Sequence, residues 1–194
     1  DMGTGNGIIP ILLSAKTPGK HFTGLEIQAD TAEMARRSVR YNDLEDRINI
    51  VTGDIKVAAD ICRPAFFDVI IKNPPYMLAQ HGLKNTDDSM AVARHEVLCS
   101  LDDILRESMR LLQDKGRFYM IHRPFRLAEI LIKMNAYKIE AKRLQFVHPY
   151  VDKEPTMVLI EGVRGAKSRV TVEPPIIMYE RNADGEQAAS VSKY

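Results

Sequence analysis

One stretch of the sequence decides how the rest is interpreted: Phe66-Phe67-Asp68-Val69-Ile70-Ile71-Lys72-Asn73-Pro74-Pro75-Tyr76. The apolar run from Phe66 to Ile71 predicts a buried β-strand. Two successive prolines cannot continue a strand, because neither has an N–H to donate and each fixes φ. The chain must therefore leave the sheet as a stiff turn with outward-facing acceptors and an aromatic side chain. Such a turn suits the binding of a planar group with N–H donors, although a proline-rich loop without a function fits the stretch alone equally well.

The composition describes an ordinary globular domain. The 194 residues are 45% hydrophobic and 27% charged, with a net charge of +1, so any basic face for a nucleic acid must be local. The two cysteines, Cys62 and Cys99, lack metal-ligand spacing and are expected to be buried free thiols in a reducing compartment. No apolar run is long enough to span a bilayer, and no signal peptide is visible. We therefore expect a cytoplasmic protein with no membrane partner and no metal.

A glycine-rich turn opens the chain as Asp1-Met2-Gly3-Thr4-Gly5-Asn6-Gly7, and the apolar residues 8–13 follow it. Three glycines at alternate positions permit φ > 0 and a close approach of the backbone to a ligand. The helix predicted next would direct its free N–H groups to the same place. Because such a turn normally follows a strand, we expect that the first strand is missing or truncated and that an N-terminal segment precedes Asp1.

Acidic side chains follow the next two predicted strands. Residues 21–27 predict a strand with Glu26 at its carboxyl end, and residues 47–52 predict another that runs into Gly53 and Asp54. In open α/β sheets, ligands bind at this edge, and an acid about 20 residues after a glycine turn grips ribose hydroxyls in nucleotide-binding folds. A solvated charge at the end of a strand is the alternative for Glu26.

Strands and helices alternate along the whole sequence. Further helices are predicted at 30–41, 55–61, 89–98, 101–112 and 124–135, and further strands at 117–122, 139–148 and 156–162. We predict an α/β fold with a Rossmann-like, doubly wound, mostly parallel sheet and an antiparallel C-terminal hairpin strand. Residues 1–165 would form the domain, and residues 166–194 a C-terminal extension with an edge strand near 170–179 and a flexible tail. The polar loop at 79–88 is predicted to be a mobile cover.

Four features together resemble the class I, S-adenosylmethionine-dependent amino-methyltransferases: the glycine turn, Glu26, Asp54 and Asn73-Pro74-Pro75-Tyr76. An NAD-binding dehydrogenase shares the first two and leaves the last unexplained. Three later motifs are similar to the bacterial tRNA1(Val) adenine-37 N6-methyltransferase family, and this similarity covers the chain to about Tyr179. They are Ala93-Arg94-His95-Glu96, Arg123-Pro124-Phe125-Arg126 and residues 153–162.

The resemblance implies S-adenosylmethionine as cofactor and S-adenosylhomocysteine as product. The glycine turn would hold the methionine moiety, Glu26 the ribose and Asp54 the adenine amino group. Asn73 and the Pro74 carbonyl would accept hydrogen bonds from the substrate NH2, and Tyr76 would stack on its ring. The implied cofactor-binding set is Asp1, Gly3, Thr4, Gly5, Gly7, Glu26, Asp54 and Asn73, and the implied catalytic turn is Asn73, Pro74, Pro75 and Tyr76.

The chemistry of an aromatic NH2 fits these residue types. Its lone pair is delocalised into the ring, and two acceptors below the nitrogen would aim that lone pair at the sulfonium methyl group. No general base is required, because the proton can leave after methyl transfer. Lys72 stands where a small or neutral residue is expected, and the sequence assigns it no role.

The sequence indicates the methyl-transfer reaction more firmly than it indicates the molecule that accepts the methyl group. Adenine N6 at position 37 of tRNA1(Val) is the first hypothesis, with N5 of a protein glutamine in release factors and N2 of a guanine in ribosomal RNA as alternatives. Binding of the cofactor without catalysis stays open, because the sequence starts after the expected first strand. Basic residues favour RNA, although a solvated surface explains them as well: Arg94, His95, Arg123, Arg126, Lys133, Lys138, Lys142, Arg143, Arg164, Lys167 and Arg169.

Overall fold

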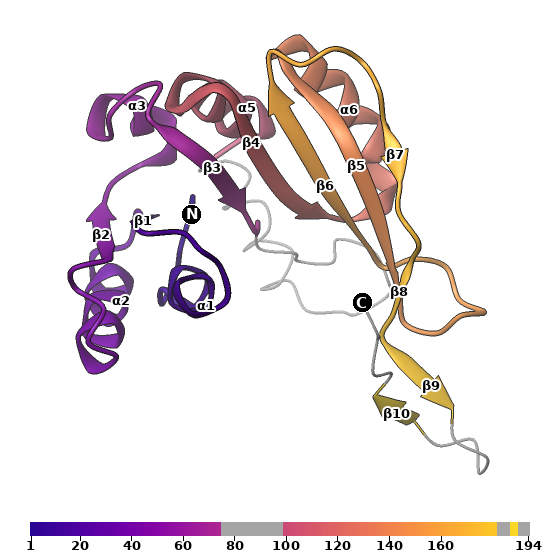
Figure 1. Ribbon diagram of the computed structural model, residues 1–194, viewed down its shortest axis with the longest axis horizontal. Helices are drawn as coiled ribbons and strands as arrows, with labels where there is room; N and C mark the ends of the chain where they lie inside the picture. The colour runs from indigo at the N-terminus through magenta and orange to yellow at the C-terminus, as the bar shows by residue number, and fades with distance from the viewer. Residues whose placement is uncertain (75–98, 182–186, 190–194) are drawn as a thin grey trace, which may run out of the picture.

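A twisted sheet with helices on both sides forms the core of the computed structural model, which describes residues 1–74, 99–181 and 187–189 (Figure 1). Helices α1 (Ile8–Lys16) and α2 (Ala29–Tyr41) lie on one side. Helices α3 (Ala58–Ile61), α5 (Leu101–Leu111) and α6 (Leu127–Ala136) lie on the other. Two short 3-10 turns, η1 (Ile55–Val57) and η2 (Pro124–Arg126), lead into α3 and α6. Among the described residues, none of the helices has the length and apolar character that a bilayer crossing requires.

The strands confirm the doubly wound, mostly parallel sheet with an antiparallel hairpin. Strand β1 (Phe22–Glu26) runs parallel to β2 (Ile48–Thr52), and β3 (Phe67–Lys72) runs parallel to β4 (Leu112–His122). Strand β6 (Met157–Arg164) lies antiparallel between β4 and β5 (Ile139–His148). Beyond β5, the short strands β7 (Thr171–Val172) and β8 (Ile176–Ile177) pair with it in parallel. A separate hairpin joins β9 (Tyr179–Arg181) to β10 (Gln187–Ala189).

The first residues of the chain lie between β1 and β3. The Leu25 N–H donates to the Asp1 carbonyl at 2.9 Å, and the Met2 N–H donates to the Ile71 carbonyl at 3.0 Å. Met2 also forms a parallel bridge with Leu25. The order across the molecule is therefore β2, β1, residues 1–3, β3, β4, β6 and β5. This order puts the start of the glycine turn next to the strand that ends at Asn73.

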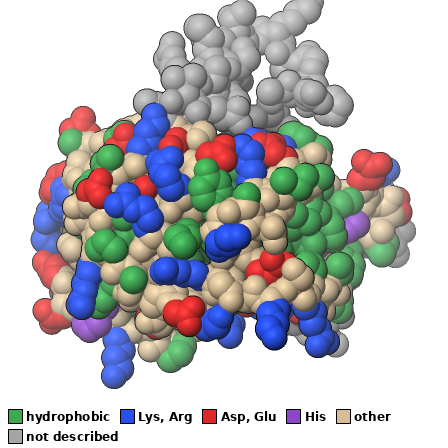
Figure 2. All heavy atoms as spheres, turned by 90° about the horizontal axis from the view of Figure 1, so that it is seen from above, with side chains coloured by type: hydrophobic (Ala, Val, Ile, Leu, Met, Phe, Trp, Pro, Cys, Tyr) green, Lys and Arg blue, Asp and Glu red, His purple; other side chains and the backbone are tan. Residues whose placement is uncertain are grey.

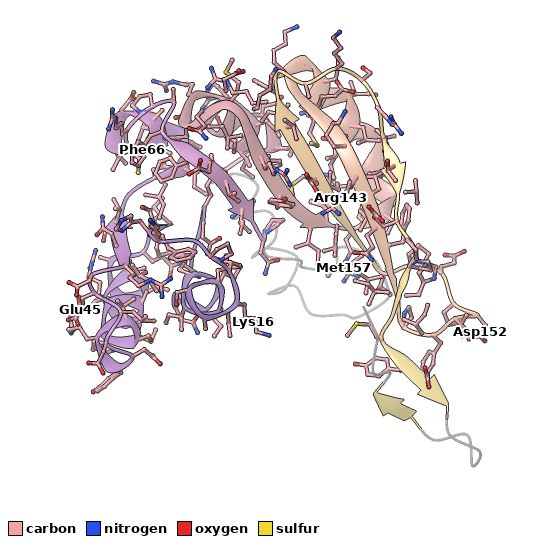
Figure 3. The ribbon with its side chains drawn as sticks, in the orientation of Figure 1. Lys16, Glu45, Phe66, Arg143, Asp152 and Met157 are labelled. Carbon is pink, nitrogen blue, oxygen red and sulfur yellow. The ribbon has the colours of Figure 1, made fainter. Side chains whose placement is uncertain are left out.

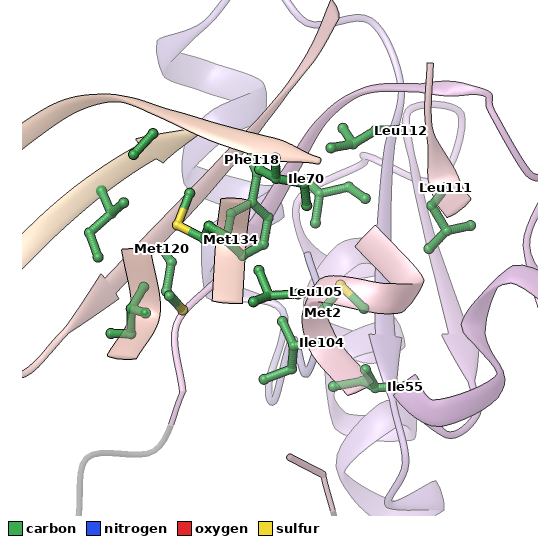
Figure 4. Close-up of a cluster of buried hydrophobic side chains, with 14 of the residues drawn as sticks. Met2, Ile55, Ile70, Ile104, Leu105, Leu111, Leu112, Phe118, Met120 and Met134 are labelled. Carbon is green, nitrogen blue, oxygen red and sulfur yellow. The ribbon is translucent and has the colours of Figure 1, made fainter. Parts of the chain in front are cut away.

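Two apolar clusters hold the helices against the two faces. On one face, α5 and α6 bury Leu105, Ile130 and Met134 against Phe118 of β4 (Figure 4). On the other, the small residues of α2 let that helix approach Ile48 and Ile50 of β2 closely. Full burial of a large apolar side chain stabilises a fold by roughly 1.5–3 kcal/mol, so these clusters fix the sheet edge that carries the site.

The structure differs from the sequence-based boundaries at two places. Strand β4 begins at Leu112 rather than at Arg117, because the ladder with β3 continues past an irregular register in which Lys115 adopts a φ of 60°. The edge strand expected at 170–179 consists of two separate two-residue strands, β7 and β8. The helix predicted at 89–98 and the loop predicted at 79–88 lie outside the described residues.

The N-terminus of α5 carries a capping box whose loss we expect to measure. The Asp103 N–H donates to Ser100 Oγ at 3.1 Å, and the Ser100 N–H donates to Asp103 Oδ2 at 3.1 Å. Ser100→Ala leaves one N–H of the first turn without its acceptor and should lower the unfolding free energy by about 1 kcal/mol in urea titrations. Ser38→Ala inside α2, where the hydroxyl donates to the Met34 carbonyl and caps no helix end, is the matched control. An equal loss in both variants would contradict the capping role.

Candidate functional site

The glycine turn has the backbone geometry that its sequence predicts. Gly3, Gly5 and Gly7 have φ values of 74°, 58° and 83°, in the left-handed region that disfavours other residues. A Cβ on Gly7 would lie 3.2 Å from the Cβ of Ala35, so this glycine lets α1 and α2 pack closely. A Cβ on Gly5 would meet no atom within 4 Å. The turn is therefore closed on the side of the helices and open at Gly5.

Glu26 is buried at the end of β1 and holds the turn in place. Its Oε2 accepts a hydrogen bond from the Gly5 N–H at 2.9 Å, and its Oε1 accepts one from the Gln28 N–H at 3.0 Å. The Glu26 carbonyl accepts from the Gly53 N–H at 2.9 Å, which brings the start of the Asp54 turn beside it. Asp54 Oδ1 in turn accepts from the Lys56 N–H at 2.9 Å. Both predicted acids thus stand at the same sheet edge, in fixed orientations.

Among the buried side-chain nitrogen and oxygen atoms of the described residues, three have no hydrogen-bond partner, and all three belong to the start of the glycine turn. They are both carboxylate oxygens of Asp1 and the hydroxyl oxygen of Thr4. Leaving a buried polar group unpaired costs about 1–3 kcal/mol, more when it is charged. Such a concentration of unused acceptors is what a binding site for a ligand with N–H or O–H donors requires.

Gly24 is a residue that the sequence interpretation missed. A Cβ at this position would lie 2.7 Å from Thr4 Cγ2 and 2.9 Å from Thr4 Oγ1. Only glycine in the middle of β1 therefore leaves room for Thr4 to lie against the strand. The available signal was a glycine inside a strand, which often marks the close approach of another part of the chain.

Asn73 follows β3 directly and is exposed. It borders a cavity of about 340 Å³ that also touches Ile9 of α1 and Tyr119 of β4. Arg143 of β5, labelled in Figure 3, lines this space and pairs with the buried Glu161, with its Nε 2.5 Å from Oε2. The volume is near the lower end for small-ligand pockets, which begin at about 300 Å³. The other two members of the predicted turn, Pro75 and Tyr76, lie outside the described residues, and Pro74 is half-buried.

Lys72 precedes Asn73 and is buried beneath the glycine turn. Its Nζ donates to the Met2 carbonyl at 2.9 Å and would lie 2.8 Å from a Cβ on Gly3. Burial lowers the pKa of Lys72, while Cys99 and Glu26 oppose that shift. Burial raises the pKa of Cys99 to about 11, so this thiol is protonated at neutral pH. Both cysteines are free, and each is half-buried.

The stability of the fold should depend on pH through Lys72. Because the folded pKa is below the ordinary value of 10.5, the buried charge costs stability at neutral pH, and this cost fades as the pH rises through the folded pKa toward the unfolded one. Lys72→Met removes the cost at every pH. Urea titrations should therefore show that the stability difference, variant minus wild type, decreases from pH 7 to about pH 10. A difference that stays constant or grows would contradict a buried charge.

Two of the predicted RNA-contacting residues, Arg123 and Arg126, have local partners within the fold. Arg123 Nη1 donates to the Thr156 carbonyl at 3.0 Å, and Arg126 pairs with Glu129 at 3.0 Å. Lys and Arg side chains alternate with Asp and Glu on the face seen in Figure 2. Arg94 and His95 lie outside the described residues. Within the described part of the chain, no group of three potential metal ligands gathers.

Comparisons with known proteins agree with this geometry. The model of a family described as "Methyltransferase small domain" matches residues 1–146. A tRNA1(Val) (adenine(37)-N6)-methyltransferase of Porphyromonas gingivalis is 31% identical over 163 residues, which cover 83% of this chain and 63% of that protein. A relative of the same description from Phocaeicola vulgatus is 26% identical over 100% of this chain and 80% of its own length. The chain thus spans less than two thirds of the Porphyromonas protein.

Solved structures show the same fold. The crystal structure of a predicted O-methyltransferase from Agrobacterium tumefaciens superposes with a TM-score of 0.72 at 23% identity, over 92% of this chain and 78% of the other. A SAM-dependent methyltransferase from Methanosarcina mazei gives a TM-score of 0.61 at 12% identity, over 86% and 92%. These likenesses establish the class I methyltransferase fold. The family match over residues 1–146 shows that the chain belongs to the methyltransferase small domain family.

Proposed function

We propose that the protein transfers a methyl group from S-adenosylmethionine to N6 of an adenine in tRNA, at position 37 of tRNA1(Val). One observation carries this proposal: the glycine turn with its unpaired acceptors and the Asn73 turn leave the sheet side by side, joined by the Met2–Ile71 hydrogen bond. A cofactor held by the first would present its methyl group to a substrate held by the second. The names of the relatives from Porphyromonas and Phocaeicola support this choice of reaction.

The residues at the sheet edge fit the cofactor. The unpaired Asp1 carboxylate and Thr4 hydroxyl suit the polar methionine end, and the open side of Gly5 leaves room beside them. Glu26 is oriented by two backbone N–H groups, which leaves it lone pairs for the ribose hydroxyls. One carboxylate oxygen of Asp54 accepts a hydrogen bond from the Lys56 N–H, and the other would accept one from the adenine amino group.

Asn73 and the Pro74 carbonyl would position the acceptor nitrogen. S-adenosylmethionine supplies the electrophilic methyl group when it is bound. The two acceptors hold both N–H bonds of the substrate NH2, so the nitrogen lone pair points away from them and toward the methyl group. Positioning and electrostatics of this kind contribute several kcal/mol to a reaction. The cavity beside Asn73 gives a base that has been rotated out of a loop a place to enter.

The choice of tRNA rests on the names of the relatives. A turn formed by Asn73 and Pro74 would recognise a planar NH2 group and would not distinguish the kind of molecule that carries it. A base in a single-stranded loop is the easiest to rotate outward, which favours an anticodon loop over a paired region. An enzyme that modifies tRNA in this way would act in the cytoplasm.

A panel of acceptors tests the proposal. The full-length protein is incubated with S-adenosylmethionine labelled in its methyl group and with tRNA, ribosomal RNA or a release factor in turn. We expect label in tRNA alone. Label in the release factor would replace adenine by a protein glutamine as the acceptor, and label in ribosomal RNA would favour guanine N2. If calorimetry detects no binding of S-adenosylmethionine, the methyltransferase proposal itself fails.

A further inference from the structure

Lys72 is the one cation among the buried charged residues of the described chain. It stands directly before Asn73, and its ammonium lies against the backbone of Met2 and Gly3. These two residues begin the turn that would hold the methionine end of the cofactor. The charge of Lys72 is therefore buried beneath the turn that would hold the cofactor.

No direct ion pair neutralises this charge within the described residues. The Met2 carbonyl is the hydrogen-bond acceptor of the Lys72 ammonium. The titratable groups whose charges act on it are Cys99 before α5 and Glu26 of β1. The Asp1 carboxylate, whose oxygens are buried without a hydrogen-bond partner, begins the same turn. Glu26 uses its oxygens on Gly5 and Gln28, and the Cys99 thiol is protonated at neutral pH because burial raises its pKa to about 11. The Lys72 ammonium therefore stands in the site with a backbone carbonyl, and no carboxylate of the described residues, in hydrogen-bond contact.

We propose that the positive charge of Lys72 makes the site discriminate between cofactor and product by their charge. It lowers the affinity for S-adenosylmethionine relative to the affinity for S-adenosylhomocysteine, whose sulfur is neutral. This inference rests on the proposed function. S-adenosylmethionine and S-adenosylhomocysteine share the adenosine and amino acid ends and differ in the methyl group and the positive charge on sulfur. A buried ammonium repels that charge through a poorly screening interior and leaves the thioether unaffected. Turnover then depends on keeping the product concentration low.

The ratio of the two affinities separates this role from two others. If Lys72 instead bound the carboxylate of the amino acid end, its loss would weaken both ligands alike, because both carry that carboxylate. If Lys72 only held the Met2 carbonyl, a neutral side chain with an N–H donor would replace it fully. In the first case the ratio Kd(S-adenosylmethionine)/Kd(S-adenosylhomocysteine) stays at the wild-type value in both Lys72 variants, and in the second case it stays there in Lys72→Gln.

The test is calorimetry of both ligands on the full-length wild type and on Lys72→Met, Lys72→Gln and Lys16→Met. Lys72→Gln keeps a donor for the Met2 carbonyl without the charge, and Lys16 is an exposed lysine at the end of α1. We expect the Kd ratio to fall on the order of tenfold in both Lys72 variants, equivalent to about one pKa unit of interaction, and to stay at the wild-type value in Lys16→Met. As the pH rises through the Lys72 pKa, the wild-type ratio should approach that of Lys72→Met.

Ratios in both Lys72 variants within twofold of the wild-type ratio would overturn the inference. So would a change in Lys72→Met that Lys72→Gln does not share, because that result would assign the effect to the hydrogen bond. If neither ligand binds the wild type, the proposed function fails instead. The two failures are therefore distinguishable.

Discussion

Asn73→Ala is expected to lower kcat for methyl transfer to tRNA by about 10²–10³-fold, the loss typical when one preorganised hydrogen-bonding group at a reacting centre is removed. Asn73 is exposed at the end of β3, beside the cavity and next to residues 1–3, so its side chain can reach an acceptor nitrogen without rearrangement of the sheet. Without the Asn73 side chain, the substrate NH2 would have the Pro74 carbonyl as its one remaining acceptor. Its lone pair would then no longer be oriented toward the methyl group of the cofactor. Single-turnover measurements with saturating cofactor and tRNA report this step.

Asn49→Ala on the exposed face of β2 is the matched control, and we expect it to retain wild-type kcat. Cofactor binding to Asn73→Ala should fall much less than kcat, because most of the proposed cofactor contacts lie in the glycine turn, Glu26 and Asp54. A kcat within a few-fold of the wild type would remove Asn73 from the catalytic turn. A loss confined to the cofactor Kd would reassign it to cofactor binding.

Glu26→Ala is expected to raise the Kd of S-adenosylmethionine about 10- to 100-fold. Hydrogen bonds to a charged group contribute about 1.5–3 kcal/mol, and this variant removes the proposed ribose acceptor together with the group that holds Gly5. The Gly5 and Gln28 N–H groups also lose their acceptor, so the free energy of unfolding should fall. Calorimetry and urea titration measure the two effects separately.

Glu33→Ala removes a carboxylate of the same kind from the exposed surface of α2, where it pairs with Arg36 and Arg40. We expect its cofactor Kd to equal that of the wild type. If Glu26→Ala is destabilised and yet binds S-adenosylmethionine with the wild-type Kd, then Glu26 is a structural acceptor for the glycine turn and does not bind the ribose.

Most of the fold could be predicted because its signals are local. The alternation of apolar runs and glycine or proline turns predicted β5 at residues 139–148, where the structure has it. The predicted start of β4 was wrong, because Asp114-Lys115-Gly116 resembles a turn. The pairing with β3 shows that the strand passes through these three residues. The split of the edge strand into β7 and β8 depends equally on a partner, β5, that lies far away in the sequence.

The residues of the candidate site also divide into those with a local sequence signal and those whose position depends on a distant part of the chain. The two acids could be identified because each follows a predicted strand, and parallel strands place their carboxyl ends at one edge. The glycines could be identified by their alternate spacing before an apolar helix. The position of Lys72 could not be predicted, because a lysine in a sequence usually indicates an exposed residue. The burial of Lys72 depends on a contact with Met2, 70 positions away in the sequence. Gly24 was missed for a related reason: the space it leaves is filled by Thr4, from another segment.

The most direct test of the central claim is identification of the methylated nucleoside. The full-length protein is incubated with total tRNA and S-adenosylmethionine that carries a deuterated methyl group, and the tRNA is then digested to nucleosides for mass spectrometry. The proposed function predicts deuterated N6-methyladenosine, and its absence after reaction with Asn73→Ala. Deuterium in a methylguanosine, or no deuterium in any nucleoside while the protein binds the cofactor, would contradict it.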